Sequence, residues 1–283
     1  MYRTILVGYD GSGQAEDALA LAEQLAESTG AGLIVARVLA PGSLIAGGSD
    51  PQLQRADVEQ VRRLERAARA VDAEAQTLTG GSVPRGLQAL AEENGADLIV
   101  VGSSDRGRVG RTLAGSVATG LLHGAPCAVA VAPRGYRTRT PAHLDAVVAG
   151  FDGSAESGQA LMAAWQLARA AQAKLRIVAV AVEPAHDQLR ENLAEARRTV
   201  PDGLEVDTTL HVGDAVEVLK EAVGAPGRML VVGSRGYGPL RRVLLGSVST
   251  KLVRGTPCPL LVTPRGPRKD QGLDQPADVP AAP

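Results

Sequence analysis

Residues 233–247 read Gly-Ser-Arg-Gly-Tyr-Gly-Pro-Leu-Arg-Arg-Val-Leu-Leu-Gly-Ser, and this stretch decides the fold. It follows a short apolar run and precedes a helix-like segment, 248–254, so it indicates a strand, a glycine-rich loop and a helix start. Gly233 and Gly236 allow a sharp turn and a close approach of the backbone to a ligand. The N–H groups of a helix that starts at Gly246 favour an anion. The loop therefore predicts a site for a polyphosphate.

The same pattern occurs earlier in the chain. Gly102 and Gly115 are 13 positions apart, as are Gly233 and Gly246. A turn of sequence Asp-Gly-Ser, each time after an apolar run, also occurs twice, and we infer two homologous domains. The resulting division is 1–134 for the first domain, 135–143 for a polar, turn-rich linker without periodicity, 144–265 for the second domain, and 266–283 for a polar, Pro-rich tail that we expect to be disordered.

Short apolar strands alternate with helix-like segments in both copies. The strands are expected at 4–7, 33–39, 74–79, 97–101 and 128–132, and again at 146–149, 175–182, 205–211, 229–232 and 260–263. This alternation predicts an α/β fold of two tandem doubly wound domains, each with a five-stranded parallel sheet covered on both faces. Ligands of such sheets bind at the carboxyl ends of the strands, where the winding reverses. The Asp10 loop should therefore face the Gly102 loop, and the Asp152 loop should face the Gly233 loop.

Composition excludes several classes of function. The net charge is −1 and aromatic residues make up 2% of the 283 residues, which gives no basis for binding nucleic acid or an anionic membrane. No apolar run approaches the roughly 20 residues of a membrane span, and the N-terminus is a strand rather than a signal peptide, so we expect a cytoplasmic protein. Cys127 and Cys258 follow prolines in equivalent contexts and are interpreted as packing residues of a reducing compartment. Neither the cysteines nor the histidines have metal-ligand or catalytic spacing.

Four motifs together resemble the universal stress protein family. They are Leu-Val-Gly-Tyr-Asp-Gly-Ser at 6–12, Val-Val-Gly-Ser-Arg-Gly at 231–236, Leu-Gly-Ser-Val-Ser at 245–249 and Thr-Pro-Cys-Pro-Leu-Leu-Val at 256–262. The resemblance covers about residues 2–133 and 144–264 and is that of a tandem member. It implies an adenine nucleotide alpha hydrolase-like fold, two domains paired as an internal pseudo-dimer, and ATP, with Mg2+, as the ligand. In the family, the motif of Gly, two residues, Gly, nine residues, Gly and Ser or Thr marks members that bind ATP.

The resemblance also implies which residues contact the nucleotide. In the second domain they are Asp152 for the nucleoside, Val180 near the adenine, and Gly233, Gly236, Gly246, Ser247 and Val248 for the phosphates. In the first domain the matching residues are Asp10, Val38, Gly102, Gly115, Ser116 and Val117. The first domain departs from the motif at Asp105, which replaces the second glycine and places a negative charge beside the expected phosphates. It also has Ala118 where the second domain has Ser249. A working site and a relic remain equally open for the first domain.

The sequence contains no catalytic signature. We find no Ser-His-Asp order with supporting context, no Gly-x-Ser-x-Gly elbow and no Walker loop ending in Gly-Lys-Ser/Thr, so no catalytic residue is predicted. The leading hypothesis is an ATP-binding stress-response regulator with an unknown protein partner. Two alternatives stay open: a nucleotide-independent scaffold that works through its sheet edges, and a slow ATPase. In the scaffold hypothesis, strand 128–132 pairs with strand 260–263 within the chain, and two chains could associate further as a homodimer.

Overall fold

The computed structural model describes residues 2–39, 51–103, 116–139, 143–181, 186–234 and 246–264. In the first domain the elements are β1 (Thr4–Gly8), α1 (Gly13–Thr29), β2 (Gly32–Leu39), α2 (Pro51–Ala70), β3 (Glu74–Thr79), α3 (Val83–Glu93), β4 (Leu98–Gly102), α4 (Ser116–Leu122) and β5 (Ala128–Ala132). A short helix, α5 (Tyr136–Arg139), follows. In the second domain they are β6 (Ala146–Phe151), α6 (Ala155–Ala170), β7 (Lys174–Ala181), α7 (His186–Thr199), β8 (Val206–Val212), α8 (Ala215–Ala222), β9 (Arg228–Gly233), α9 (Ser247–Val253) and β10 (Leu260–Thr263).

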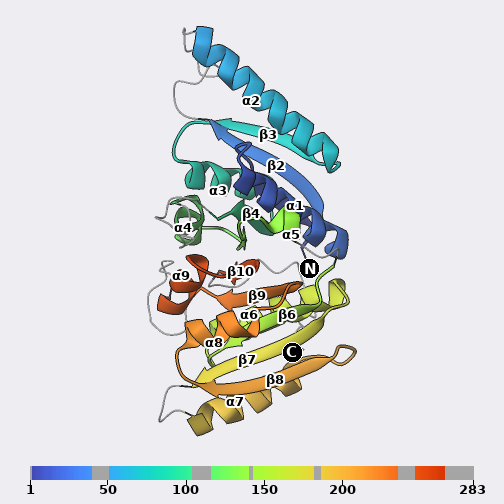
Figure 1. Cartoon of the computed structure of the whole chain (residues 1–283), viewed down its shortest axis with the longest axis vertical. Helices are drawn as coiled ribbons and strands as arrows, with labels where there is room; N and C mark the ends of the chain where they lie inside the picture. Colours follow the sequence, from blue (N-terminus) through green and yellow to red (C-terminus); the bar gives the residue numbers. More distant parts are fainter. Residues whose placement is uncertain are drawn as a thin grey trace, which may run out of the picture.

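The strands form one continuous sheet. Its order is β3-β2-β1-β4-β5-β10-β9-β6-β7-β8, so both domains have the same doubly wound order and the two are joined edge to edge. Figure 1 shows the strands stacked along the long axis, with α2 at one end and α7 at the other. The α/β fold, the tandem arrangement and the pseudo-dimer expected from the sequence are confirmed, and the two five-stranded sheets are joined into one of ten strands.

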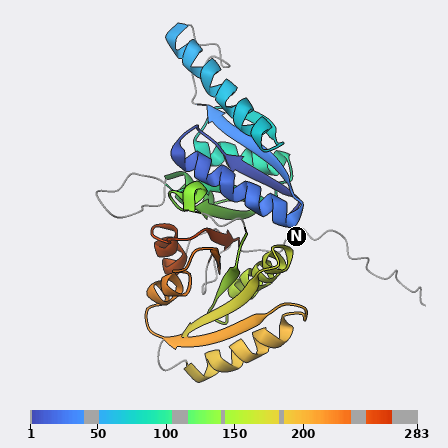
Figure 2. The ribbon, with the colours of Figure 1, turned by 45° about the vertical axis from the view of Figure 1, so that its right-hand side comes forward.

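The domains meet where β5 and β10 pair, as the scaffold hypothesis expected, and the pairing is antiparallel. Leu260 lies opposite Val131, and Leu261 lies opposite Ala130. Within each domain the recorded pairs are parallel. Figure 2 shows the two halves meeting at this seam. The last strand of each domain is therefore covered by its counterpart, and β3 and β8 are the edges of the described sheet.

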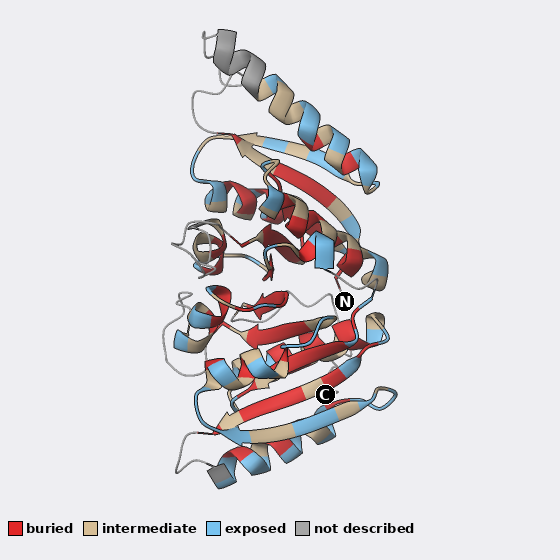
Figure 3. Cartoon of the chain, in the orientation of Figure 1, coloured by how far each residue is buried: buried red, intermediate tan, exposed pale blue. Residues whose placement is uncertain are grey.

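Two aliphatic cores lie on opposite faces of the sheet, and both continue across the seam. One core gathers buried residues of α1, α2, α6 and α7, and the other gathers those of α3, α4, α8 and α9. Figure 3 shows the buried residues concentrated in the central strands and on the inner faces of the helices. Because each core is shared by the two domains, hydrophobic burial holds them together in addition to the β5–β10 hydrogen bonds.

The linker contains regular structure that the sequence did not predict. Within α5, Tyr136 is buried and its hydroxyl donates to the side chain of Gln24 on α1. The buried carboxylate of Asp17 accepts hydrogen bonds from the N–H groups of Gly135 (2.7 Å) and Arg137 (3.1 Å). These long-range contacts stabilise a turn that has no apolar periodicity of its own, because they satisfy backbone donors that the polar sequence leaves without partners.

The cysteines are unpaired thiols. Cys258 is buried and Cys127 is half-buried, so the packing interpretation fits Cys258 better. Burial raises the pKa of both thiols to about 12, which keeps them protonated and unreactive near neutral pH. Among the described residues, no helix has both the length and the apolar character of a membrane span.

Candidate functional site

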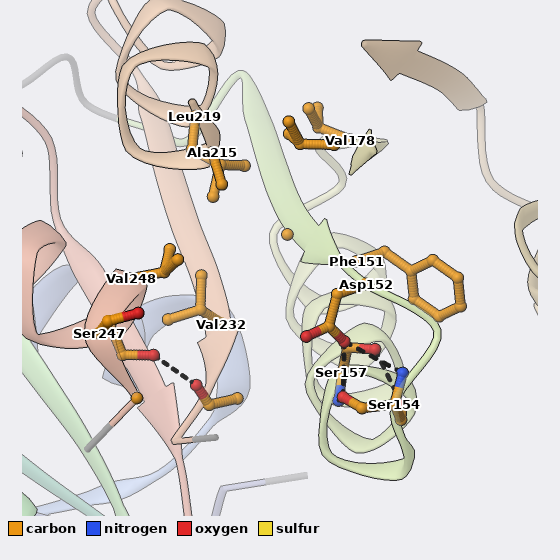
Figure 4. A pocket seen from close by; sticks show the side chains of 15 residues that line it. Phe151, Asp152, Ser154, Ser157, Val178, Ala215, Leu219, Val232, Ser247 and Val248 are labelled. Carbon is orange, nitrogen blue, oxygen red and sulfur yellow. Dashed lines mark hydrogen bonds between the residues drawn. The ribbon is translucent and has the colours of Figure 1, made fainter. Parts of the chain in front are cut away.

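A cavity of about 480 Å³ opens at the carboxyl ends of β6, β7 and β9 and at the start of α9. Figure 4 shows Ser247 and Val248 on one side of it and Asp152 on the other. Its lining is Gly150, Phe151, Asp152, Ser154, Ser157, Val178, Val180, Ala215, Leu219, Val232, Gly233, Gly246, Ser247, Val248 and Ser249. Six of the seven second-domain residues predicted from the sequence thus lie around one space, and the seventh, Gly236, lies outside the described residues.

Asp152 has a structural role and also lines the cavity. Its Oδ1 accepts hydrogen bonds from the N–H of Ser154 (3.0 Å) and from the Ser154 hydroxyl (2.6 Å). Ser154 in turn caps α6, since its Oγ accepts a hydrogen bond from the N–H of Ser157 (3.2 Å). The Asp-Gly-Ser sequence therefore forms the turn between β6 and α6, as Asp and Ser do at helix starts. The same turn holds the carboxylate at the cavity wall.

The walls beside Asp152 are apolar, and the sequence reasoning found only one of their residues, Val180. The missed apolar residues are Phe151, Val178, Ala215, Leu219 and Val232. A signal for them existed. Val178 is two positions before Val180 and so shares its face of the strand, and Ala215 and Leu219 are one helical turn apart on α8. These residues give the cavity a wall suited to a flat apolar group.

The cap of α8 fixes the position of that wall. Asp214 accepts hydrogen bonds from the N–H groups of Val216 (2.8 Å) and Glu217 (3.1 Å). The bond from Glu217 is the main cause that holds the pKa of the exposed Asp214 carboxyl below its usual range. The Glu217 carboxylate accepts a hydrogen bond from Lys220 (3.0 Å). The cap places Ala215 at the start of the helix, against the cavity.

Gly233 is required by the approach of a neighbouring helix. A Cβ added at this position would lie 2.9 Å from the carbonyl oxygen of Glu156 and 3.0 Å from its carbonyl carbon. The glycine therefore lets the first turn of α6 pack against the end of β9. The sequence attributed this glycine to the approach of a ligand, and the structure supplies packing as the physical reason, although Gly233 also lines the cavity.

The start of α9 closes the cavity opposite Asp152. Gly246 is its N-cap, with φ of −60° and ψ of 157°, and no side chain of the described residues caps this helix start. The N–H of Gly246 donates to the carbonyl of Ser234 (2.7 Å). The hydroxyl of Ser249 donates to the carbonyl of Gly233 (2.8 Å), which ties the helix to the end of β9. An uncapped helix start facing a cavity leaves backbone N–H groups available for an anion.

Comparisons with known proteins identify the family of this chain. The profile of the universal stress protein family matches residues 1–133 and 143–264. A universal stress protein of Mycobacterium tuberculosis is 30% identical over 296 residues, covering 92% of this chain and 99% of that protein. The chain belongs to the universal stress protein family. A shorter universal stress protein of Thermus aquaticus is 39% identical over 142 residues, covering 46% of this chain and 97% of that protein.

The solved structures that resemble this universal stress protein include that of a family member from Archaeoglobus fulgidus. It superposes with a TM-score of 0.71 at 21% identity, covering 93% of this chain and 98% of that chain. At this level of identity the likeness supports the fold. The described residues of the chain contain no group of three or more His, Cys, Asp or Glu side chains that could hold a metal ion.

The first domain places its predicted site residues at the equivalent edge of the sheet. Asp10 follows β1, Val38 lies near the end of β2, Gly102 ends β4, and Val117 lies in the first turn of α4. Because β1 pairs with both β2 and β4, the three strand ends are neighbours. Ser116 is the first residue of α4, whereas Gly115 and Asp105 lie outside the described residues.

In the first domain, Gly102 is required by helix packing, as Gly233 is in the second. A Cβ at Gly102 would lie 2.2 Å from the carbonyl oxygen of Gln14 in the first turn of α1. Asp10 forms the matching turn, since its Oδ1 accepts a hydrogen bond from the N–H of Ser12 (2.9 Å). Ala118, which replaces Ser249, is fully buried. The two domains thus share the turn and the helix–strand contact, and the serine hydroxyl that ties α9 to β9 has no counterpart at Ala118.

Proposed function

We propose that the second-domain cavity binds an adenine nucleotide, ATP in the first place, and that the protein is a cytoplasmic stress-response regulator. The observation that carries the proposal is the division of the cavity into two chemically different ends. One end has aliphatic walls, and the other has a carboxylate facing an uncapped helix start. Membership of the universal stress protein family supports the same assignment.

In this proposal the adenine lies between Val180 and the α8 wall, where Leu219 and Ala215 supply apolar contacts. A flat heteroaromatic ring gains most from such walls, because apolar pocket surfaces supply the affinity while a few polar groups set the orientation. Asp152, at the turn after β6, would accept hydrogen bonds from ribose hydroxyls, as a fixed carboxylate does in many nucleotide sites.

The phosphates would lie at the start of α9, beside Gly246 and Ser247. The backbone N–H groups of a helix start and its dipole favour negative charge there. Mg2+ would enter with the phosphates, since this ion is usually bound through substrate phosphates and one or two carboxylates. Among the described lining residues, Asp152 is the one carboxylate that could assist.

The chemistry of the lining favours binding over turnover. Asp152 is the only ionisable side chain among the described residues that line the cavity, so these residues offer no Lys, His or Cys as a nucleophile or proton donor. Arg241 and Arg242 belong to the loop outside the described residues. Hydrolysis of ATP would then be slow and incidental, and the bound nucleotide would act on the affinity for a protein partner.

Substitution of Gly246 by Asp gives a sharp test. The backbone of Gly246 has the extended conformation of an ordinary N-cap, and Asp is among the best N-cap residues, so the fold should be retained. The new carboxylate would accept from the same N–H groups and repel phosphates, at roughly 4 kcal/mol for a unit-charge pair 4 Å apart at an effective dielectric constant of about 20. We expect an affinity for ATP at least about 100-fold lower, measured by calorimetric titration.

Gly246→Asn is the matched control, because it caps the helix without a charge. Its amide oxygen occupies the same N–H groups but does not repel the phosphates, so it should lose clearly less affinity than Gly246→Asp. Both variants should unfold at the same temperature as the wild type or above it. Nucleotide released from the denatured wild-type protein should amount to about one per chain if only the second domain binds. If purified wild-type protein neither carries a nucleotide nor binds added ATP, the proposal fails and the scaffold hypothesis takes its place.

A further inference from the structure

A second cavity, of about 240 Å³, lies at the junction between the domains. It is formed by segments far apart in the sequence: Gln24 of α1, residues 133–136 and Arg139 around the start of the linker, Leu144, the loop 223–228 before β9 and the loop 257–259 before β10. The last two loops lie at the amino ends of their strands. The cavity is therefore at the opposite edge of the sheet from the proposed nucleotide site, and the six residues of β9 separate the two by roughly 20 Å.

The linker side of this junction cavity is held in place by buried polar groups. Asp17 accepts hydrogen bonds from the N–H groups of Gly135 and Arg137, and Gln24 accepts one from the hydroxyl of Tyr136. Asp17, Gln24 and Tyr136 are all more than nine-tenths buried. The wall that carries Arg134 and Arg139 is thus fixed before any ligand arrives, and preorganisation lowers the entropic cost of binding.

The second-domain side contributes apolar surface and one anchored guanidinium. Leu144, Val223 and Cys258 are buried, and they line the cavity together with prolines of the two loops. Arg228, at the start of β9, donates from its guanidinium to the carbonyl of Ala222 (2.7 Å). This bond holds the Arg228 side chain at the cavity wall, so the position of its guanidinium group is fixed by the fold.

The charged side chains among the described lining residues are Arg134, Arg139 and Arg228. Two carboxylates lie close behind the lining. Asp17 accepts hydrogen bonds from the N–H groups of Gly135 and Arg137, and a Cβ at Gly227 would lie 2.3 Å from Oδ2 of Asp145. Three guanidinium groups outnumber these two carboxylates, and this excess of positive charge favours an anion.

We propose that the junction cavity binds a small organic anion, a carboxylate or phosphate ester with a compact apolar body. The guanidinium groups of Arg139 and Arg228 would hold the anionic group, since planar guanidinium groups suit carboxylates and phosphates. Leu144, Val223 and the prolines would cover the apolar body. The cavity is smaller than the roughly 300–1,000 Å³ of pockets for drug-sized ligands, which favours a compact ligand.

Such a ligand would contact the linker and the second domain at once. Arg139 belongs to the linker and Arg228 to the second domain, so binding would hold the two together and raise the thermal stability of the whole chain. The proposal does not depend on the function proposed for the second-domain cavity, because the two spaces share none of their described lining residues.

Calorimetric titration of the full chain with phenyl phosphate tests the proposal. Benzoate and inorganic phosphate distinguish carboxylate from phosphate and the contribution of the apolar body, and benzyl alcohol is the neutral comparison. We expect phenyl phosphate or benzoate to bind at least about tenfold more tightly than benzyl alcohol, because hydrogen bonds to charged groups contribute more than neutral ones. Arg139→Gln and Arg228→Gln should each weaken binding of the preferred anion about tenfold.

Arg137→Gln is the matched control, since Arg137 is an exposed residue of the same helix and does not line the cavity. It should bind as the wild type does. Ala225→Leu, on an exposed lining position, should block the cavity without changing its charge. The proposal is overturned if the arginine variants and Ala225→Leu bind like the wild type, if benzyl alcohol binds equally well, or if Gly246→Asp alone abolishes binding.

Discussion

The two domains have the same strand order, and they differ where a helix passes over the second strand. In the first domain α3 comes very close to β2, since a Cβ at Gly86 would lie 2.6 Å from Cγ2 of Val38. In the second domain the equivalent residue is Val218, four positions after the N-cap in both helices. A helix with a valine there cannot approach β7 as closely. Val180, the counterpart of Val38, lines the 480 Å³ cavity.

The two copies of the repeat keep their packing features and differ at the residue that overlies the second strand. The turns of Asp10 and Asp152 and the helix contacts of Gly102 and Gly233 are packing features, and both domains retain them. The room beside the second strand depends on a single side chain on the overlying helix. We infer that the apolar end of the crevice is narrower in the first domain, whatever the effect of Asp105 on the phosphate end.

The largest expected effect comes from adding a methyl group to the two strand-end glycines. Gly102→Ala would place its Cβ 2.2 Å from a carbonyl oxygen of α1, whereas Gly233→Ala would place it 2.9 Å from one of α6. Backbone atoms cannot move aside as a side chain does, so we expect a loss of about 3 kcal/mol in the free energy of unfolding for Gly102→Ala. We expect about 1 kcal/mol for Gly233→Ala. Urea unfolding monitored by circular dichroism measures both.

The same two substitutions distinguish a packing role of Gly233 from a role in ligand contact. If Gly233 serves packing, Gly233→Ala lowers stability while the remaining folded protein keeps its affinity for ATP within about threefold. If stability were unchanged and affinity were lost, the glycine would serve the ligand directly, as the sequence alone suggested. Equal losses at Gly102 and Gly233 would contradict the difference in spacing between the two helix contacts.

A smaller effect is expected from exchanging the residues over the second strand. Gly86→Val should destabilise the protein by about 1–3 kcal/mol, because Val38 has a stiff side chain and the helix must shift outward. Val38→Ala should recover part of this loss in the double variant, which thermal unfolding would show as a non-additive shift. Val218→Ala is the control in the second domain and should cost less than Gly86→Val. Additive effects of Gly86→Val and Val38→Ala would refute the contact.

Most of the fold could be predicted from the sequence because its signals are local. The runs 128–132 and 260–263 are strands with the predicted bounds. The helix α5 was not predicted, and the reason is physical. Its stability comes from Asp17 and Gln24, more than 100 positions away, and no local pattern indicates that two polar residues of an amphipathic helix are buried to receive a linker.

The site was less predictable than the fold. The motif residues of the second domain line one cavity, because the repeat and the strand order place the loops together. Ala215 and Leu219 were missed since the sequence does not state which face of α8 turns to the crevice. The packing role of Gly233 could not be predicted from the sequence either. A glycine needed for a neighbouring helix and one needed for a ligand look alike until the distance to Glu156 is known.

The smallest expected effect concerns the residue before each Asp turn, Tyr9 in the first domain and Phe151 in the second. The Tyr9 hydroxyl donates to Glu16 at 2.5 Å, and the second domain has Gly158 in place of the glutamate. Tyr9→Phe removes this bond. We expect a loss of about 1 kcal/mol in the free energy of unfolding at pH 7, since Glu16 is half-buried and water replaces part of the interaction.

The pH dependence of this loss has a definite sign. Burial, and then the hydrogen bond to Glu16, raise the pKa of Tyr9 to about 12 from a usual value of 10.0. The neutral phenol is therefore favoured in the folded state, and its contribution to stability is complete below pH 10 and is lost as the pH rises from about 10 to 12. The wild type should lose its advantage over Tyr9→Phe across that interval in urea unfolding at a series of pH values. Cys127 and Cys258 also destabilise the fold at alkaline pH, but they do so equally in both proteins, so the difference isolates Tyr9. A constant difference up to pH 12 would mean that Tyr9 ionises alike in the folded and unfolded chains.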